Sequence, residues 1–185
     1  MSLTIKTVNQ YISALRSHSP TPGGGSASAL VSSLGISLGI MVLGILSKKK
    51  KTNQVKVKQL TKSLKLKLTK TNKLINQDAK AYQAVMKAYG LGKGNKDRKK
   101  KIETALKNAF LVMHELALLS KAAKKEVAQI KKLGSGAILN DVEVALSFLD
   151  AAKAGAKSTA KINLDYLSSK TLKTQLRKKY VAIGA

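Results

Sequence analysis

Apolar residues recur at steps of three and four along most of the chain, which is the spacing that places side chains on one face of an α-helix. The longest pattern runs from Val57 to Tyr89, and a second one runs from Ile102 to Ile130. A glycine-rich stretch at 90–95 separates them and is typical of a turn. The sequence therefore predicts two long helices joined by a short loop, arranged as an antiparallel hairpin.

Helical spacing also predicts shorter helices before and after this hairpin. Pro20 and the glycines at 23–25 form a loop, because the residue before a proline avoids helical geometry and glycine loses the most entropy in a helix. No linker is long enough to divide the chain, so we expect an all-α multihelical bundle that occupies 1–185 as a single domain. The further predicted helices are 3–16 with Thr4 as its N-cap, 26–46 with Ser26 as its N-cap, 140–167 and 171–180.

The segment from Ser19 to Ser47 contains no charged residue, and four lysines follow it directly. This is the outline of a membrane span with a positive flank. Its many serines and glycines instead favour a helix that other helices approach closely on several sides. We therefore expect a core helix and no membrane partner. Residues 1–18 lack the apolar run of a secretory signal, so a cytoplasmic location is expected.

The charge of the chain is strongly basic, with 35 Lys and Arg against nine Asp and Glu and a net charge of +26. Such a charge predicts attraction to anions. Arginines are few and aromatic residues are 4% of the chain, so base-specific nucleic-acid binding is not expected, although salt-sensitive polyanion binding stays an alternative. The lack of cysteine and the presence of two histidines exclude a disulfide scaffold, a cysteine nucleophile and a histidine-rich metal site, and we expect no metal.

Polar side chains interrupt the apolar patterns at two places. Asp78 lies between Ile75 and Tyr82, where burial of a carboxylate costs several kcal/mol unless a partner compensates it. The carboxylate is therefore either paired, for example with a lysine, or used in chemistry. Asn163 interrupts the last pattern in the same way, and an interhelical hydrogen bond is the structural alternative to a binding role.

Two further candidates follow or belong to glycine-rich loops. Asp141 precedes an apolar helical pattern, where an acidic residue also serves simply as an N-cap or a first-turn acid. The other candidate is the loop Pro22, Gly23, Gly24, Gly25 and Ser26. Glycines before a helix can offer backbone N–H groups to an anion, but this loop lacks the pattern of a phosphate-binding loop. A tight turn between helices explains the glycines equally well.

Three blocks of the sequence resemble the cyclodeaminase/methenyltetrahydrofolate cyclohydrolase family of folate enzymes, which includes the C-terminal domain of formiminotransferase-cyclodeaminase. The most specific block is Ser19-Pro20-Thr21-Pro22-Gly23-Gly24-Gly25-Ser26 with the small-residue helix after it. The others are 78–93, which begins Asp78-Ala79-Lys80-Ala81-Tyr82, and 134–164, which ends Ile162-Asn163-Leu164. The chain departs from the family pattern at Ser135, Gly92 and Thr159, where the family usually has asparagine, proline and asparagine.

The resemblance implies an all-helical homodimer in which the helical hairpin is a dimerisation element. It implies hydrolysis of 5,10-methenyltetrahydrofolate to 10-formyltetrahydrofolate, or cyclisation of formiminotetrahydrofolate with release of ammonia. Asp78 and Asp141 are the implied catalytic residues, the first moving protons and the second orienting substrate or water. The residues implied to bind substrate are Pro22, Gly23, Gly24, Gly25, Ser26, Tyr82 and Asn163.

The implied ligand is a tetrahydrofolate derivative as substrate, with no permanently bound cofactor. A polyglutamate tail on that folate would be attracted by the lysines. A non-catalytic folate-binding or structural relative is the alternative. Asp141 and Asn163 are 22 residues apart, about 33 Å along an unbroken helix. One pocket can therefore hold both only if Gly155 breaks that helix or a second subunit contributes.

Overall fold

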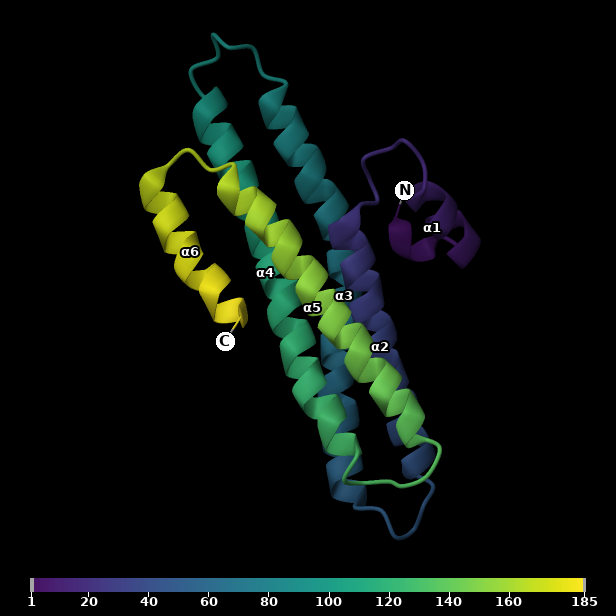
Figure 1. Cartoon of the computed structure of the whole chain (residues 1–185). Coiled ribbons are helices and arrows are strands. Elements are labelled where there is room, and N and C mark those ends of the chain that lie inside the picture. Colours follow the sequence, from purple (N-terminus) through teal and green to yellow (C-terminus); the bar gives the residue numbers. More distant parts are fainter. Residues whose placement is uncertain (1, 185) are drawn as a thin grey trace.

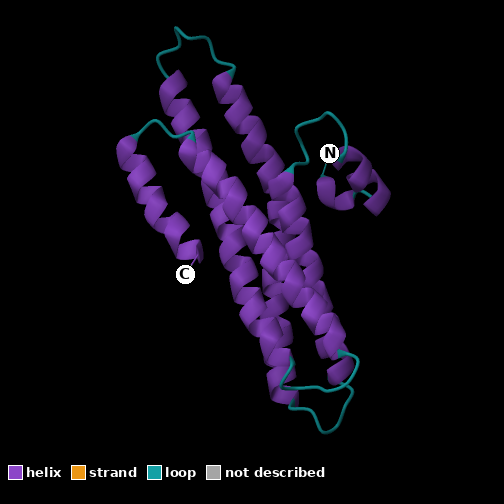
Figure 2. Ribbon diagram, in the orientation of Figure 1, coloured by secondary structure: helices purple, strands orange, loops and turns teal. Residues whose placement is uncertain are grey.

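The computed structural model describes residues 2–184, and every regular element within them is helical (Figures 1 and 2). The all-α prediction is thereby confirmed. The elements are the 3-10 turn η1 (Leu3–Ile5) and the helices α1 (Val8–Leu15), α2 (Gly24–Leu46), α3 (Gln54–Tyr89), α4 (Arg98–Ile130), α5 (Leu139–Asp165) and α6 (Lys170–Gly184).

The helices α2, α3, α4 and α5 form a bundle in which each is antiparallel to the next along the chain (Figure 1). The predicted hairpin is present as α3 and α4, while its role in dimerisation stays a prediction. The tip of this hairpin extends well beyond the first residue of α2. After α5 the chain turns back, so that α6 packs against α4 and α5. Two buried apolar clusters fill the bundle, one toward each end.

Small residues let the other helices come close to α2. A Cβ added to Gly35 would lie 3.0 Å from the carbonyl oxygen of Ala145, and one added to Gly39 would lie 2.8 Å from Val127 Cγ2. Within residues 2–184, α2 is also the one helix long and apolar enough to cross a membrane, and 50% of its most apolar window is buried. Helices α3, α4 and α5 all pack against α2, so the expected close approach by several helices is present, while the remaining side of α2, with Leu34, Met41 and Ile45, is exposed.

The predicted helix over 3–16 is wrong in its bounds and its cap. Thr7 is the N-cap of α1, and it forms a capping box with Gln10, so Thr4 is not the cap. Tyr11 points into the core, whereas the apolar residues that defined the helical pattern are exposed. These exposed residues are Ile5, Val8, Ile12 and Leu15.

Three other boundaries differ from the prediction. The N-cap of α2 is Gly23 and not Ser26, so Gly24 and Gly25 belong to its first turn. Helix α5 ends at Asp165, two residues before the predicted end, and α6 extends four residues past Tyr180 to Gly184. Glycine costs little at the start of α2, because the first turn of a helix has few intrahelical hydrogen bonds to lose. A larger residue would not fit at Gly25, because the side chain of Asp78 occupies the space beside it.

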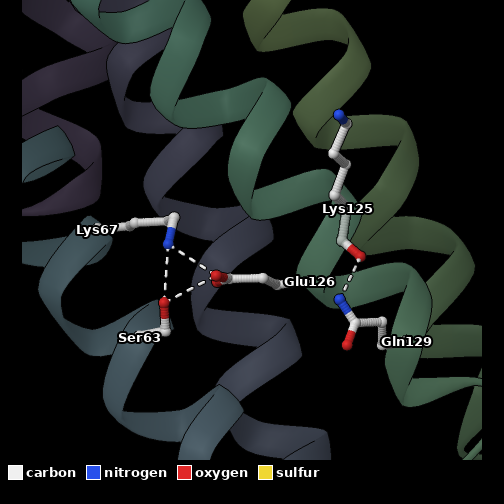
Figure 3. A network of polar contacts seen from close by, with 5 residues as sticks. All are labelled: Ser63, Lys67, Lys125, Glu126 and Gln129. Atoms are coloured by element: carbon white, nitrogen blue, oxygen red, sulfur yellow. Dashed lines mark hydrogen bonds and ion pairs between the residues drawn. The ribbon is translucent and has the colours of Figure 1, made fainter.

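A polar cluster of Ser63, Lys67 and Glu126 links α3 to α4 (Figure 3). Lys67 Nζ donates to Glu126 Oε1 and to Ser63 Oγ, each over 2.9 Å, and Ser63 Oγ donates to the same carboxylate oxygen over 2.7 Å. One turn further along α4, Gln129 donates from Nε2 to the carbonyl oxygen of Lys125. The cluster therefore fixes the register of the hairpin with largely buried groups.

Replacement of Glu126 by alanine is expected to lower the free energy of unfolding by about 1 to 2 kcal/mol, because Lys67 keeps its charge but loses its acceptor. Urea unfolding measures this loss. Asp97→Ala is the matched control, since the pair of Asp97 with Lys101 is exposed and 3.8 Å long, and it should cost less than about 0.5 kcal/mol. Equal losses in the two variants would contradict the structural role of the cluster.

Candidate functional site

A cavity of about 460 Å³ lies where α2 begins inside the bundle. The first turn of α2 is level with Asp78 of α3, and α3 continues for another 11 residues, about 16 Å, beyond that point. The cavity occupies the space beyond α2 among α3, α4 and α5. Its lining residues are Pro20, Thr21, Gly23, Gly24, Gly25, Asp78, Tyr82, Val85, Met86, Tyr89, Leu106, Ala109, Thr159, Ile162, Asn163 and Tyr166.

Asp78 is the acidic residue of this cavity. Its Oδ2 accepts a hydrogen bond from the backbone N–H of Ser26 over 2.8 Å. A Cβ on Gly25 would lie 2.5 Å from Asp78 Cγ, so only glycine permits this approach of α2 to the carboxylate. Burial raises the pKa of Asp78 above its ordinary value, while the bond from Ser26 and the positive end of the α2 dipole favour the charged form. The partner of Asp78 is thus a backbone group and not a lysine.

Tyr11 and Ser26 form a buried pair behind Asp78. The Tyr11 hydroxyl lies 2.9 Å from Ser26 Oγ, Tyr11 is 6% exposed and Ser26 is fully buried. Burial raises the pKa of Tyr11, the hydrogen bond with Ser26 opposes this, and the charge of Asp78 raises it further. Tyr11 therefore stays a neutral phenol that anchors α1 to the same residue whose N–H holds Asp78.

The structure brings most of the candidate residues together in this cavity. Gly23, Gly24, Gly25, Asp78, Tyr82 and Asn163 line it. Asn163 donates from Nδ2 to the carbonyl oxygen of Thr159 in its own helix, so the hydrogen bond offered as a structural alternative is intrahelical. Pro22, which follows a cis peptide bond, and Ser26 are buried and support the cavity from behind.

Asp141 lies far from the cavity of its own chain. It is in the first turn of α5, as its position after the glycine loop predicts, and α5 is unbroken up to Asn163, about 33 Å away. Since Gly155 does not break the helix, the first way of bringing both residues into one pocket does not occur. A role for Asp141 in catalysis therefore requires a second copy of the chain.

Known proteins resemble this chain over nearly its whole length. The sequence model of the formiminotransferase-cyclodeaminase family matches residues 7–182. A methenyltetrahydrofolate cyclohydrolase of Methylorubrum extorquens is 32% identical over 174 residues, which are 90% of this chain and 81% of that relative. The chain belongs to the formiminotransferase-cyclodeaminase family. The resemblance drawn from the three sequence blocks is confirmed.

Other members of the formiminotransferase-cyclodeaminase family are more distant in sequence or longer. The formimidoyltransferase-cyclodeaminase of Gallus gallus is 27% identical over 180 residues, which are 94% of this chain, and the match spans only 33% of that relative. The solved structure of a formiminotetrahydrofolate cyclodeaminase from Thermotoga maritima matches with a TM-score of 0.87 at 22% identity, over 97% of this chain and 89% of that one. This last likeness shows that the fold is shared.

Of the tyrosines at the site, the sequence analysis named Tyr82 and missed Tyr11, Tyr89 and Tyr166. Four of the five tyrosines gather here, since Tyr82, Tyr89 and Tyr166 line the cavity and Tyr11 lies behind it. In a chain with 4% aromatic residues, the position of tyrosines near the ends of two predicted helices was an available signal. Thr159 also lines the cavity. Its departure from the family pattern did not predict this position.

Replacement of Tyr11 by phenylalanine is expected to lower the free energy of unfolding by about 1 kcal/mol, because the Ser26 hydroxyl stays buried without its partner. Thermal or urea unfolding measures the effect. Tyr180→Phe, on α6 and away from the cavity, serves as the matched control and should change stability by less than about 0.5 kcal/mol. Wild-type stability in Tyr11→Phe would show that the Tyr11–Ser26 contact contributes nothing.

Proposed function

We propose that this chain is a folate one-carbon enzyme that hydrolyses 5,10-methenyltetrahydrofolate to 10-formyltetrahydrofolate or cyclises formiminotetrahydrofolate with release of ammonia. Membership of the formiminotransferase-cyclodeaminase family and the cyclohydrolase relative support this activity. The observation that supports it most directly is the placement of Asp78, a carboxylate of raised pKa held against the glycine-rich start of α2 inside a cavity.

Asp78 is the group that moves protons in either reaction. In hydrolysis, the oxygen of water bonds to the methenyl carbon and Asp78 takes one proton from that water, which leaves a hydroxyl on the carbon. The bond from this carbon to N5 then breaks, Asp78 returns its proton to N5, and the hydroxyl loses its proton to solvent as the formyl C=O forms. In cyclisation, N10 bonds to the carbon of the protonated formimino group, and Asp78 takes the N10 proton and gives it to the NH2 nitrogen. The bond from the carbon to that nitrogen then breaks, and ammonia leaves. A carboxylate whose pKa is raised toward working pH suits both directions of transfer.

The cavity has the size and chemistry of a small-molecule site. Ligand pockets typically enclose about 300 to 1,000 Å³ and are mostly apolar with a few polar groups. Tyr82, Tyr89 and Tyr166 offer flat faces for the ring system of a folate, and the first-turn N–H groups of α2 have no intrahelical acceptor. The tyrosines would hold the ring plane while Asn163 and the N–H groups orient its polar edge.

We further propose that the chain works as a homodimer and that Asp141 takes part in the site of a second copy. The distance between Asp141 and Asn163 within one chain supports this, because no single cavity in residues 2–184 contains both. In that role Asp141 would orient the substrate or the attacking water.

The decisive experiment offers both substrates to the purified full chain. The loss of methenyltetrahydrofolate is followed by its absorbance, and the release of ammonia from formiminotetrahydrofolate is followed by a coupled assay. We expect a protein-dependent rate with one of them, well above the spontaneous reaction and above the rate of Asp78→Asn at the same concentration. Binding of the folate without turnover of either substrate would contradict the enzymatic proposal and favour a non-catalytic relative.

A further inference from the structure

The outward side of α3 carries a row of lysines. Helix α3 contains nine lysines, and six of them fall within an arc of about 80° around its axis, at steps of three, four, seven or eight residues. These six side chains are exposed and extend for about 44 Å along the helix. We call them the lysine row, and its members are Lys58, Lys62, Lys65, Lys73, Lys80 and Lys87.

No acidic residue of α3 interrupts the lysine row. Asp78 is the one acidic residue of this helix, and it lines the cavity on the opposite side of the helix axis. Lys67, whose charge Glu126 compensates, lies at the contact with α4 and is not part of the row. The residues between the lysines on the outward side are polar and uncharged, namely Thr69, Asn76 and Gln83.

Further lysines extend the positive charge beyond both ends of α3. The lysine run 48–51 precedes the helix, and the run 99–101 follows the loop after it. The turn η1 packs against the middle of α3, where the Leu3 N–H donates to Asn76 Oδ1 over 2.6 Å, but the lysines on either side of this contact stay exposed. The positive charge therefore follows α3 from one end of the bundle to the other (Figure 1).

Lysine is not spread evenly over the helices of this chain. Helix α2 has no charged residue, and α5 has three lysines against four acidic residues. Helix α3 has nine lysines against one acidic residue. A general excess of lysine would appear on every exposed helix, so its concentration on one side of the bundle indicates a surface for an anionic partner.

We propose that the lysine row binds a double-stranded nucleic acid along its phosphodiester backbone, without regard to base sequence. A straight row about 44 Å long complements a stiff linear polyanion, and duplex DNA carries one charge for about every 1.7 Å of its axis. Arginine, which reads base edges, is absent from α3, so the contacts carry no sequence information. This function goes beyond the proposed folate chemistry and uses none of the cavity residues.

The surroundings of the row favour a duplex over a membrane or a single strand. A helix that lies on a membrane inserts its apolar side among the lipids, whereas the apolar side of α3, with Leu60, Leu64 and Leu74, is buried in the bundle. Proteins that bind single strands without sequence preference stack the bases on aromatic side chains, and the lysine row contains none. Charge alone attracts the polymer with the highest charge density, which is the duplex.

The salt dependence of binding to a DNA duplex of about 20 base pairs tests the row, with the purified full chain and fluorescence anisotropy. The logarithm of the association constant should fall with the logarithm of salt with a slope of about −5, because each neutralised phosphate contributes about 0.9. The triple variant Lys62→Gln, Lys65→Gln and Lys73→Gln should have a slope of about −3. It should bind at least about 10-fold more weakly at about 50 mM salt.

The matched control removes the same charge from another part of the surface. Lys107→Gln, Lys125→Gln and Lys178→Gln, combined in one chain, alter exposed positions on α4 and α6. This variant should keep the wild-type slope and an affinity within about threefold, because charges far from the contact are screened. Glutamine and lysine have similar helix propensities, and circular dichroism checks that both triple variants are folded.

Lysine acetylation read by mass spectrometry locates the contact directly. The duplex should protect the lysine row from acetylation and leave Lys107 and Lys178 reactive. Protection of those two lysines with an unprotected row would place the contact elsewhere and overturn the proposal.

Four other results would count against the proposal. A wild type that does not bind the duplex at about 50 mM salt would overturn it outright. Equal losses in the two triple variants would assign the attraction to net charge and overturn the role of the row. A single strand of the same length that binds as tightly as the duplex, or phosphatidylglycerol vesicles that bind at a salt concentration that releases the duplex, would overturn the choice of partner. None of these measurements involves a folate, so a failure here is distinct from a failure of the proposed activity.

Discussion

Replacement of Asp78 by asparagine is expected to lower kcat by about 10²- to 10⁴-fold, the usual contribution of a positioned general acid or base. The asparagine oxygen can still accept the Ser26 N–H and the side chain keeps its shape, so KM should change by only a few fold. The change would thus remove proton transfer without removing the cavity. Steady-state kinetics with the preferred substrate measures both constants.

The pH dependence of turnover tests the role of Asp78 in a second way. Turnover that uses the Asp78 carboxylate as a base should fall toward low pH as the group is protonated. Because burial raises its pKa, this acidic limb should lie above the ordinary aspartate range near pH 4. Asp150→Asn, which alters an exposed carboxylate on α5, should keep the wild-type profile.

Asp78→Asn should lower activity without lowering the melting temperature. A carboxyl whose pKa is higher in the folded than in the unfolded chain contributes stability that is fully present below about pH 4 and is lost as pH rises through the folded pKa. At neutral pH the wild type has lost that contribution, so the variant should melt at the same or a higher temperature. An inactive variant that is also clearly less stable would point to a structural role.

Replacement of Gly25 by alanine is expected to have the second large effect. The new Cβ would overlap the Asp78 carboxylate and force it away from the Ser26 N–H. We expect kcat/KM to fall at least about 100-fold, since misplacement by about 1 Å is enough for such a loss. Stability should fall by about 1 to 3 kcal/mol, as is usual for overpacking a closely packed site.

Gly44→Ala is the matched control for this substitution. Gly44 lies in the same helix, and an added Cβ would meet nothing within 4 Å. Alanine there should raise the free energy of unfolding by about 0.5 to 1 kcal/mol through its higher helix propensity and leave kinetics unchanged. Wild-type kinetics in Gly25→Ala would mean that the contact with Asp78 is irrelevant to turnover.

The helical periodicity predicted the long elements well because each buries a continuous apolar side. The end of α3 at Tyr89 and the end of α2 at Leu46 agree with the sequence prediction. The same logic failed at the N-terminus, where Val8 and Ile12 are exposed and Tyr11 is buried. Periodicity identifies a side of a helix that differs from the rest, but it does not identify which side another element covers.

The sequence predicted only part of the candidate site, because residue types reveal unusual side chains but not the contacts that the fold creates. An acidic residue inside an apolar pattern identified Asp78, and the spacing of α5 correctly separated Asp141 from Asn163 in one chain. The sequence did not reveal that the partner of Asp78 is the backbone of Ser26, since a backbone N–H leaves no trace in residue types. For the same reason Tyr11 was not connected with the site, because the contact depends on how α1 lies against α2.

The depth of the cavity depends on where α2 begins relative to α3. The first turn of α2 lies level with Asp78, and α3 continues for 11 more residues beyond it. Each residue that joined the start of α2 in helical form would fill about 1.5 Å of that depth. Insertions and deletions in 19–23, more than substitutions in the walls, are therefore the changes by which relatives of this chain could evolve to accept larger or smaller molecules.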